Sequence, residues 1–146
     1  MKISIQKEDF DAGAEIAALK TDAGIGAIAT FIGTVRGTGG VEALNLEHYP
    51  SMTEREIARL IDEAKSRWAL SGVTIIHRIG KLKVGENIVL VVTASAHRRD
   101  ALAACEFLID QMKTNAPFWK EEERNGTREW VPARASDDAA AEKWRK

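Results

Sequence analysis

The sequence predicts an α+β domain with a mixed, mainly antiparallel sheet and flanking helices. Its 146 residues are the size of one domain. Segments with strand character come mostly in pairs, with a helical segment between one pair and the next. The dipeptide Asn125-Gly126 joins one such pair, and it is a strong hairpin signal because both turn residues need a positive φ. Paired strands interrupted by helices are typical of α+β folds.

The first half of the chain is predicted to fold in the order strand, helix, strand, strand, helix. Asp9 or Asp11 can cap the first helix, which runs to about Lys20. The second helix begins where Thr53 and Glu56 have capping-box spacing, in which each side chain can bond a free backbone N–H. Apolar or alternating side chains predict the three strands, at residues 2–6, 24–35 and 41–49.

The second half is predicted to contain two strands, a long helix, two strands and a short helix. Residues 87–96 show almost no polar alternation, so this strand is expected at the centre of its sheet. The long helix spans about 97–115, and Pro117 prevents its continuation. Ser136 can cap the last helix. The remaining strands are expected at 73–82, 118–124 and 127–132. The apolar stripe of the long helix consists of Ala101, Leu102, Cys105, Leu108, Ile109 and Met112.

The composition excludes several classes of protein. Its 21 basic and 22 acidic residues argue against a nucleic-acid coat or a membrane-surface binder, because both need an excess of positive charge. One cysteine excludes a disulfide framework and a thiolate metal cage. The longest apolar run, 88–92, is far shorter than the roughly 20 residues of a membrane helix. Charges near the N-terminus leave no room for the apolar core of an export signal. We therefore expect a cytoplasmic protein that binds neither nucleic acid nor membrane.

The cysteine and two of the three histidines are not predicted to carry chemistry. Cys105 lies on the apolar stripe, so a small buried side chain is favoured over a reactive thiol. If the protein moves sulfur, that sulfur is therefore not expected to rest on its own thiol. His48 and His77 alternate with apolar residues and are expected to pack in the core or an interface. No histidine spacing or acidic cluster predicts a metal site.

His97 and Arg36 each have two interpretations, as part of an anion-binding site or as an ordinary surface residue. His97 opens the long helix beside Arg98 and Arg99, where three bases oppose the helix dipole unless an anion lies nearby. A solvated basic turn is the alternative. Arg36 stands in a glycine-rich loop that matches no phosphate-binding fingerprint, so a surface loop is favoured there. Three further cations are unremarkable when taken singly: Lys113, Lys120 and Arg134.

Six short blocks resemble the large, catalytic subunit family of molybdopterin synthase. Each block is weak alone, but together they are specific, and they occur in the family order from residue 31 to residue 134. They read FIGTVRG at 31–37, LEHYP at 46–50 followed by Met52-Thr53, HRIG at 77–80, SAHR at 95–98, KTNAPFWK at 113–120 and WVPAR at 130–134.

The resemblance implies a single domain over residues 1–146 with an α/β-hammerhead-like fold. It also implies a sulfurtransferase of molybdenum cofactor biosynthesis, which converts cyclic pyranopterin monophosphate into molybdopterin by installing two sulfurs as a dithiolene. The sulfur arrives as a thiocarboxylate on the C-terminal Gly-Gly of a small ubiquitin-like carrier subunit. Two large subunits form a homodimer, and one carrier docks on each to give a heterotetramer. No cofactor or metal takes part in this step, because molybdenum is inserted later.

The resemblance further implies which residues bind the substrate. Arg36, His97 and Arg98 would hold the phosphate and the pterin. Thr34 and Val35 would line that site. Both anionic reactants would therefore meet a local cluster of cations within a protein of nearly neutral charge.

Lys113 and Lys120 are implied as the catalytic residues. Lys113 would lie where the carrier tail meets the substrate, as an acid or as a stabiliser of the charge that acyl transfer develops. Lys120 would contact the substrate and help to protonate or orient it. Arg134 would reach a neighbouring subunit's site. Many family members carry a base directly after the second lysine, where this chain has Glu121, so Glu121 and Glu122 are expected to contribute backbone contacts.

Two other functions stay open from the sequence. One is a non-catalytic phosphoanion-binding regulatory module built on a similar sheet. The other is an interaction scaffold with solvated basic turns, which leaves the ordered blocks unexplained. Lys113 and Lys120 discriminate an enzyme from a binder, because binding alone needs no cation where the carrier tail enters.

Overall fold

A computed structural model describes residues 1–131 and 135–145, and it contains two four-stranded sheets. Sheet A consists, from edge to edge, of β1 (Lys2–Gln6), β4 (Leu70–Arg78), β6 (Asn87–Ser95) and β2 (Ala27–Thr34). Sheet B consists of β5 (Gly80–Lys83), β3 (Ala43–His48), β7 (Phe118–Arg124) and β8 (Thr127–Trp130). Among the described residues, only β1 and β4 pair in parallel, and the other strand pairs are antiparallel. The predicted α+β class and mainly antiparallel pairing are confirmed, with two sheets in place of one.

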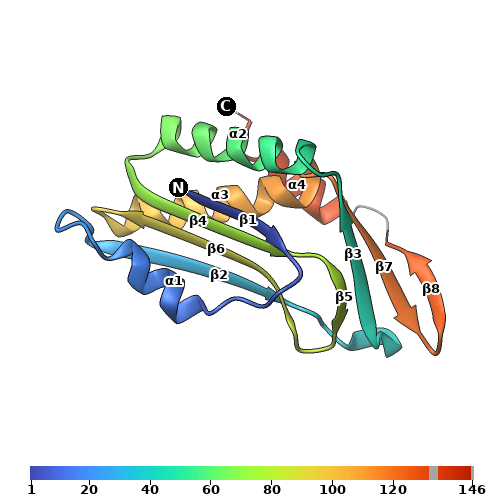
Figure 1. Ribbon diagram of the computed structural model, residues 1–146. Coiled ribbons are helices and arrows are strands. Elements are labelled where there is room, and N and C mark those ends of the chain that lie inside the picture. The colour runs from blue at the N-terminus through green and yellow to red at the C-terminus, as the bar shows by residue number, and fades with distance from the viewer. Residues whose placement is uncertain (132–134, 146) are drawn as a thin grey trace.

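The helices cover both faces of sheet A. Figure 1 shows α2, α3 and α4 on one face, α1 on the other, and sheet B at one end. In the described part of the chain the α-helices are α1 (Ala12–Leu19), α2 (Met52–Arg67), α3 (Arg98–Asn115) and α4 (Ala135–Glu142), and one 3₁₀ turn, η1, spans Thr38–Gly40.

The core lies on both sides of β6, as its unbroken apolar run predicts. The residues from Val89 to Ser95 are all buried. One apolar cluster packs between sheet A and α2 and α3, and a second packs between sheet A and α1. A third lies where the two sheets meet, and its members are Val35, Val41, Leu44, Leu46 and Leu82.

Two turn signals are confirmed by the structure. The Asp11 carboxylate accepts a hydrogen bond of 3.0 Å from the Ala14 N–H and caps α1. The hairpin between β7 and β8 turns at Asn125 and Gly126, which have φ values of 50° and 78°. Both positive φ values are those that the Asn-Gly pair favours.

The predicted capping box at the start of α2 is wrong. The helix begins at Met52, so Thr53 lies inside it and Ser51 is the N-cap residue, with φ 69° and no side-chain cap bond. The Thr53 hydroxyl instead accepts from the Tyr49 N–H at 3.1 Å and donates to the Pro117 carbonyl at 3.0 Å. A bond to a residue 64 positions away cannot be read from local spacing. Thr53 therefore ties the start of α2 to the end of α3.

The single strand predicted at 73–82 is two strands in different sheets. β4 ends at Arg78 and β5 begins at Gly80, whose φ of 88° turns the chain from sheet A into sheet B. Only glycine adopts such a φ without a steric penalty. The apolar pattern continues through this turn because each sheet has its own core.

The predicted apolar stripe of α3 is wrong at one position. Leu102 is 60% exposed, whereas Phe107, which the stripe omits, is 0% exposed. Phe107 packs edge-on against Trp68 of the α2 C-cap and against Trp144, which follows α4. The Trp144 indole N–H also donates to the Asp110 carboxylate at 2.7 Å. One aromatic cluster therefore joins α2, α3 and the C-terminal segment.

Candidate active site

Two lysines line a cavity of about 370 Å³ where sheet A meets sheet B, and we call it the lysine cavity. Its walls include the apolar side chains of Phe31, Met112 and Phe118. The polar side chains come from β2, β4, α3, β7 and α4, and they are Thr34, His77, Lys113, Thr114, Lys120 and Asp137. The lysine cavity therefore combines apolar walls with cations of the kind that hold an anionic ligand.

Lys113 and Lys120 both line the lysine cavity, and the turn that joins α3 to β7 lies between them in the sequence. Lys113 lies in the last turn of α3, and Pro117 prevents the helix from continuing. Lys120 follows on β7, on the same strand face as Phe118. The bond from the Thr53 hydroxyl to the Pro117 carbonyl holds the turn against α2. The backbone thus brings the two cations to one cavity, as the resemblance implies.

His77 also lines the lysine cavity, although its alternation with apolar residues predicts only packing. Its ring is stacked on Phe118, with centroids 3.7 Å apart and planes 16° apart. Its Nδ1 lies 2.8 Å from the Arg78 carbonyl oxygen. Because a carbonyl oxygen only accepts, Nδ1 carries the proton and donates this bond. The neutral ring therefore keeps its lone pair on Nε2.

The charge of His77 is controlled by its surroundings. Burial lowers the pKa of His77 to about 4, although the hydrogen bond to the Arg78 carbonyl opposes this shift. The nearby charges of Lys120 and Lys113 lower the pKa further, and His48 adds a smaller effect. His77 is therefore an uncharged member of a cationic site at neutral pH.

The first group of predicted site residues is divided by the structure. Thr34 lies at the end of β2 and lines the lysine cavity. Val35 is only 3% exposed, and its side chain packs in the cluster between the two sheets instead. Arg36 is exposed and follows Thr34 by two residues, so it lies within about 7 Å of it along the backbone.

His97 and Arg98 lie far from the two lysines of the same chain. His97 is the N-cap residue of α3, with no side-chain cap bond, and Arg98 is the first residue of the helix. At 1.5 Å per residue, α3 separates Arg98 from Lys113 by about 22 Å. Both His97 and Arg98 are exposed. One chain therefore does not bring all the predicted site residues to one place.

The acidic pair and the last arginine complete the predicted set. Glu121 and Glu122 lie on β7 directly after Lys120, and neither lines the lysine cavity. The Glu122 carboxylate accepts from the Arg124 guanidinium at 3.1 Å. Arg134 lies outside the described residues.

Asp137 is a cavity residue that the sequence analysis missed. It lies in the first turn of α4 and brings a carboxylate to a cavity that also contains Lys113 and Lys120. Its position depends on how α4 packs against α3 rather than on a local motif. No pattern in the sequence around it signals this placement.

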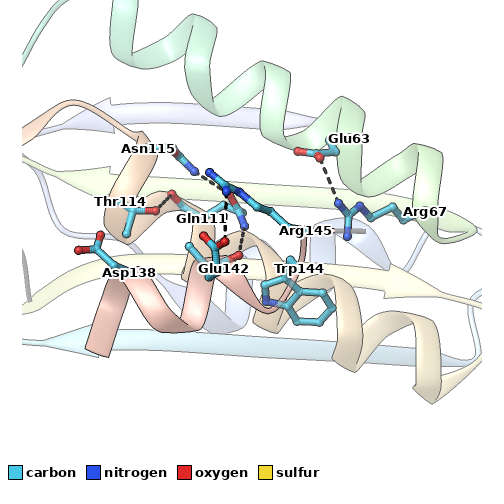
Figure 2. A pocket seen from close by; sticks show the side chains of 10 residues that line it. Glu63, Arg67, Gln111, Thr114, Asn115, Asp138, Glu142, Trp144 and Arg145 are labelled. Atoms are coloured by element: carbon cyan, nitrogen blue, oxygen red, sulfur yellow. Dashed lines mark hydrogen bonds and ion pairs between the residues drawn. The ribbon is translucent and has the colours of Figure 1, made fainter. Parts of the chain in front are cut away.

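A larger hollow, of about 750 Å³, lies between α2, α3 and the C-terminal segment, and Figure 2 shows its side chains. Its acids, bases and amides bond one another, through the pairs Glu63–Arg67 at 3.2 Å, Gln111–Asn115 at 2.6 Å and Glu142–Arg145 at 3.1 Å. None of the predicted site residues lines it. The lysine cavity is therefore the stronger candidate for the active site.

Two further observations concern the part of the chain that the structure describes. Among these residues, no cluster of three or more His, Cys, Asp or Glu side chains could hold a metal ion. No helix within them is long and apolar enough to span a membrane.

Comparisons with known proteins support the family resemblance seen in the sequence. The family model described as "MoaE protein" matches residues 5–115. The chain is 52% identical to a molybdopterin synthase catalytic subunit of Mesorhizobium japonicum, over 98% of this chain and 92% of that protein. Its structure resembles the molybdopterin biosynthesis MoaE protein from Burkholderia ambifaria, with a TM-score of 0.85, 48% identity, and 98% and 97% of the two chains covered. The fold also recurs in a protein–protein complex of subunit 1 and 2 of molybdopterin-converting factor from Helicobacter pylori, with a TM-score of 0.77 and 24% identity over 90% and 91% of the two chains.

Proposed function

The chain belongs to the MoaE family, the catalytic subunits of molybdopterin synthase in molybdenum cofactor biosynthesis, and from this premise we propose that the lysine cavity is its active site. There the enzyme transfers sulfur from the C-terminal thiocarboxylate of a small carrier subunit to cyclic pyranopterin monophosphate. Two such transfers install the dithiolene of molybdopterin. Residues 1–146 act as one domain in this reaction.

The observation that carries the proposal is the placement of Lys113 and Lys120 in one cavity with apolar walls. The substrate phosphate and the thiocarboxylate are both anions, and acyl transfer develops further charge on oxygen or sulfur. Cations that are already in place stabilise such charge without reorganisation, and apolar walls strengthen the attraction by excluding water. Thr34 adds a hydroxyl that can bond the substrate at the same cavity.

The proposal includes a small partner subunit as the sulfur donor. The name of the relatives, catalytic subunit, implies a second kind of subunit, and the Helicobacter pylori protein of the same fold was solved as a complex of subunits 1 and 2. The buried Cys105 is consistent with an external donor. Burial is the main reason that the pKa of the Cys105 thiol is raised to about 11. The thiol is therefore uncharged and unreactive at neutral pH.

A second copy of the chain can bring together the predicted site residues that lie far apart in one chain. His97 and Arg98 lie about 22 Å from Lys113 along α3, so they serve a different site from the lysines of their own chain. In a two-fold dimer, residues from one end of α3 can complete the lysine cavity of the other copy. We therefore place His97 and Arg98 at the partner's phosphate.

The test of the proposed function is a purified assay. The protein is mixed with a thiocarboxylated carrier and cyclic pyranopterin monophosphate, and dithiolene product is measured over time. Product that depends on all three components supports the proposal. Tight binding of the pyranopterin with no product would favour the phosphoanion-binding module instead.

Cys105→Ser is expected to leave turnover within about twofold of the unsubstituted enzyme. Its effect is on stability, about 1–3 kcal/mol, because a serine hydroxyl at this buried position lacks a good partner. The Cys105 thiol has only weak contacts, to the Val91 carbonyl oxygen at 3.9 Å and to the Thr93 side chain. Urea unfolding and the purified assay measure the two effects. A folded but inactive variant would contradict an external sulfur donor.

Mixed dimers test whether the second copy of the chain completes the lysine cavity. Arg98→Ala and Lys113→Ala are each expected to be nearly inactive alone. A mixed dimer has one site that lacks both side chains and one intact site, so random mixing restores about a quarter of the normal activity. The purified assay measures this recovery, and light scattering measures the dimer. A monomer at micromolar concentration, or no recovery after subunit exchange, would count against the arrangement.

A further inference from the structure

The ring of His77 has one nitrogen that the protein uses and one that it leaves available. Nδ1 donates to the Arg78 carbonyl, 2.8 Å away. Among the described residues, Nε2 has no hydrogen-bond partner, yet it is not one of the polar atoms sealed from solvent without a partner. Because His77 lines the lysine cavity, Nε2 is open to a molecule bound there.

The ring is also held rigidly. It is stacked on Phe118 at a centroid distance of 3.7 Å, and β4 is paired on both sides, with Ile5 and Val89 as the register partners of His77. The stack and the Nδ1 bond together fix the ring plane and the tautomer. His77 and Phe118 therefore form a stacked aromatic pair with a single acceptor atom, at the edge of the His77 ring.

The lysines beside His77 leave a use for an acceptor in the lysine cavity, in addition to the Asp137 carboxylate. Lys113 of α3 and Lys120 of β7 are hydrogen-bond donors in the lysine cavity. His48 of β3 lies close enough to affect the ring, and Asp137 of α4 is the one carboxylate among the described residues of the cavity. Lysines bind the anionic parts of a ligand but cannot accept a bond from its N–H groups. A neutral imidazole can.

We propose that His77 is a substrate-orienting residue whose unprotonated Nε2 accepts a hydrogen bond from an N–H or O–H group of the pyranopterin ring system. The heterocycle lies beside the edge of the His77 ring, because the Nε2 lone pair lies in the ring plane. The lysines, together with His97 and Arg98 of the other copy, bind the phosphate and the thiocarboxylate. His77 thereby distinguishes a heterocycle with a donor at this point from one without it. This inference rests on the proposed function of the lysine cavity.

The test compares two substitutions that separate the ring from its acceptor. His77→Phe keeps an aromatic ring against Phe118 and removes Nε2, and we expect about a 10- to 100-fold loss in kcat/KM for the pyranopterin. His77→Gln keeps an acceptor near the position of Nε2 and should stay within about fivefold of the unsubstituted enzyme. His48→Phe is the matched control, because His48 does not line the cavity, and it should stay within about twofold. The KM for the carrier should not change in any of them.

Each outcome decides the inference. Equal losses for His77→Phe and His77→Gln would mean that the ring, and not its acceptor, matters, and would overturn it. So would activity of His77→Phe equal to that of His48→Phe. If the unsubstituted protein makes no dithiolene product, the proposed function fails, and that result is separate from a comparison of variants.

A second measurement uses the unsubstituted protein and needs no turnover. Histidine-ring ¹H–¹⁵N spectra should show His77 with its proton on Nδ1, and the ring should stay neutral on acidification until the pH approaches about 4. Addition of cyclic pyranopterin monophosphate should shift the Nε2 resonance of His77, whereas inorganic phosphate should not. A ring protonated on Nε2, or an Nε2 resonance that the pyranopterin leaves unchanged, would overturn the inference even if a variant fails to fold.

Discussion

Lys113→Ala and Lys120→Ala are each expected to lower turnover by at least about 10²–10³-fold while the protein stays folded and binds its carrier. Both side chains line the lysine cavity, and each contributes a fixed positive charge where two anions meet. The loss should fall mainly on kcat, because acyl transfer concentrates negative charge on one oxygen or sulfur atom in the transition state more than in the bound reactants. Steady-state kinetics with the thiocarboxylated carrier measures it.

The controls for this prediction are matched in chemistry. Lys65→Ala removes the same charge from an exposed position of α2 outside the lysine cavity, and it should be nearly neutral. Lys113→Arg should restore little activity, because a planar guanidinium differs in shape and does not readily give up a proton. Near-normal product formation by both alanine variants would refute the catalytic assignment and favour the binding module.

Phe107→Ala is expected to lower the free energy of unfolding by about 3–5 kcal/mol. Phe107 is 0% exposed, and its ring contacts Trp68, Trp144 and the Arg67 guanidinium. Its removal leaves a cavity at the point where α2, α3 and the C-terminal segment meet. Urea unfolding followed by tryptophan fluorescence measures the change, since two of the ring partners are tryptophans.

Leu102→Ala provides the comparison on the same helix. Leu102 is 60% exposed, and surface substitutions of this kind change stability by no more than about 0.5 kcal/mol. A loss for Phe107→Ala as small as that for Leu102→Ala would show that the aromatic cluster does not stabilise the fold. The pair therefore tests the structure's correction of the predicted apolar stripe.

The elements of the fold were largely predictable because their signals are local. The Asp11 cap and the Asn-Gly hairpin depend on residues within a few positions of one another. The errors involve partners that are distant in sequence. Thr53 bonds Pro117 instead of its own helix end, and Gly80 moves the chain to a second sheet although the apolar pattern continues through it. Periodicity shows which side chains are buried, but it does not show which residues they pack against.

The candidate site was predictable only in part for the same reason. The resemblance points to Lys113 and Lys120, and the structure places both in one cavity. His77 has the alternation of a core residue, and its stacking on Phe118 is packing, so the pattern is correct about burial. Its place at the end of β4, where sheet A stops and the lysine cavity begins, depends on how two sheets meet. No single segment of sequence contains that information.

The strand order of sheet A has a consequence for how the chain folds as it is synthesised. Within residues 1–131 and 135–145, β2 pairs only with β6 and β1 pairs only with β4, so neither N-terminal strand has a partner close to it in sequence. At about 5–20 residues per second, the ribosome takes roughly 3–12 s to extend the chain from the end of β2 to the end of β6. During that interval the apolar strand Ala27–Thr34 is exposed without its partner, and this is the period in which a nascent chain of this fold most needs protection from aggregation.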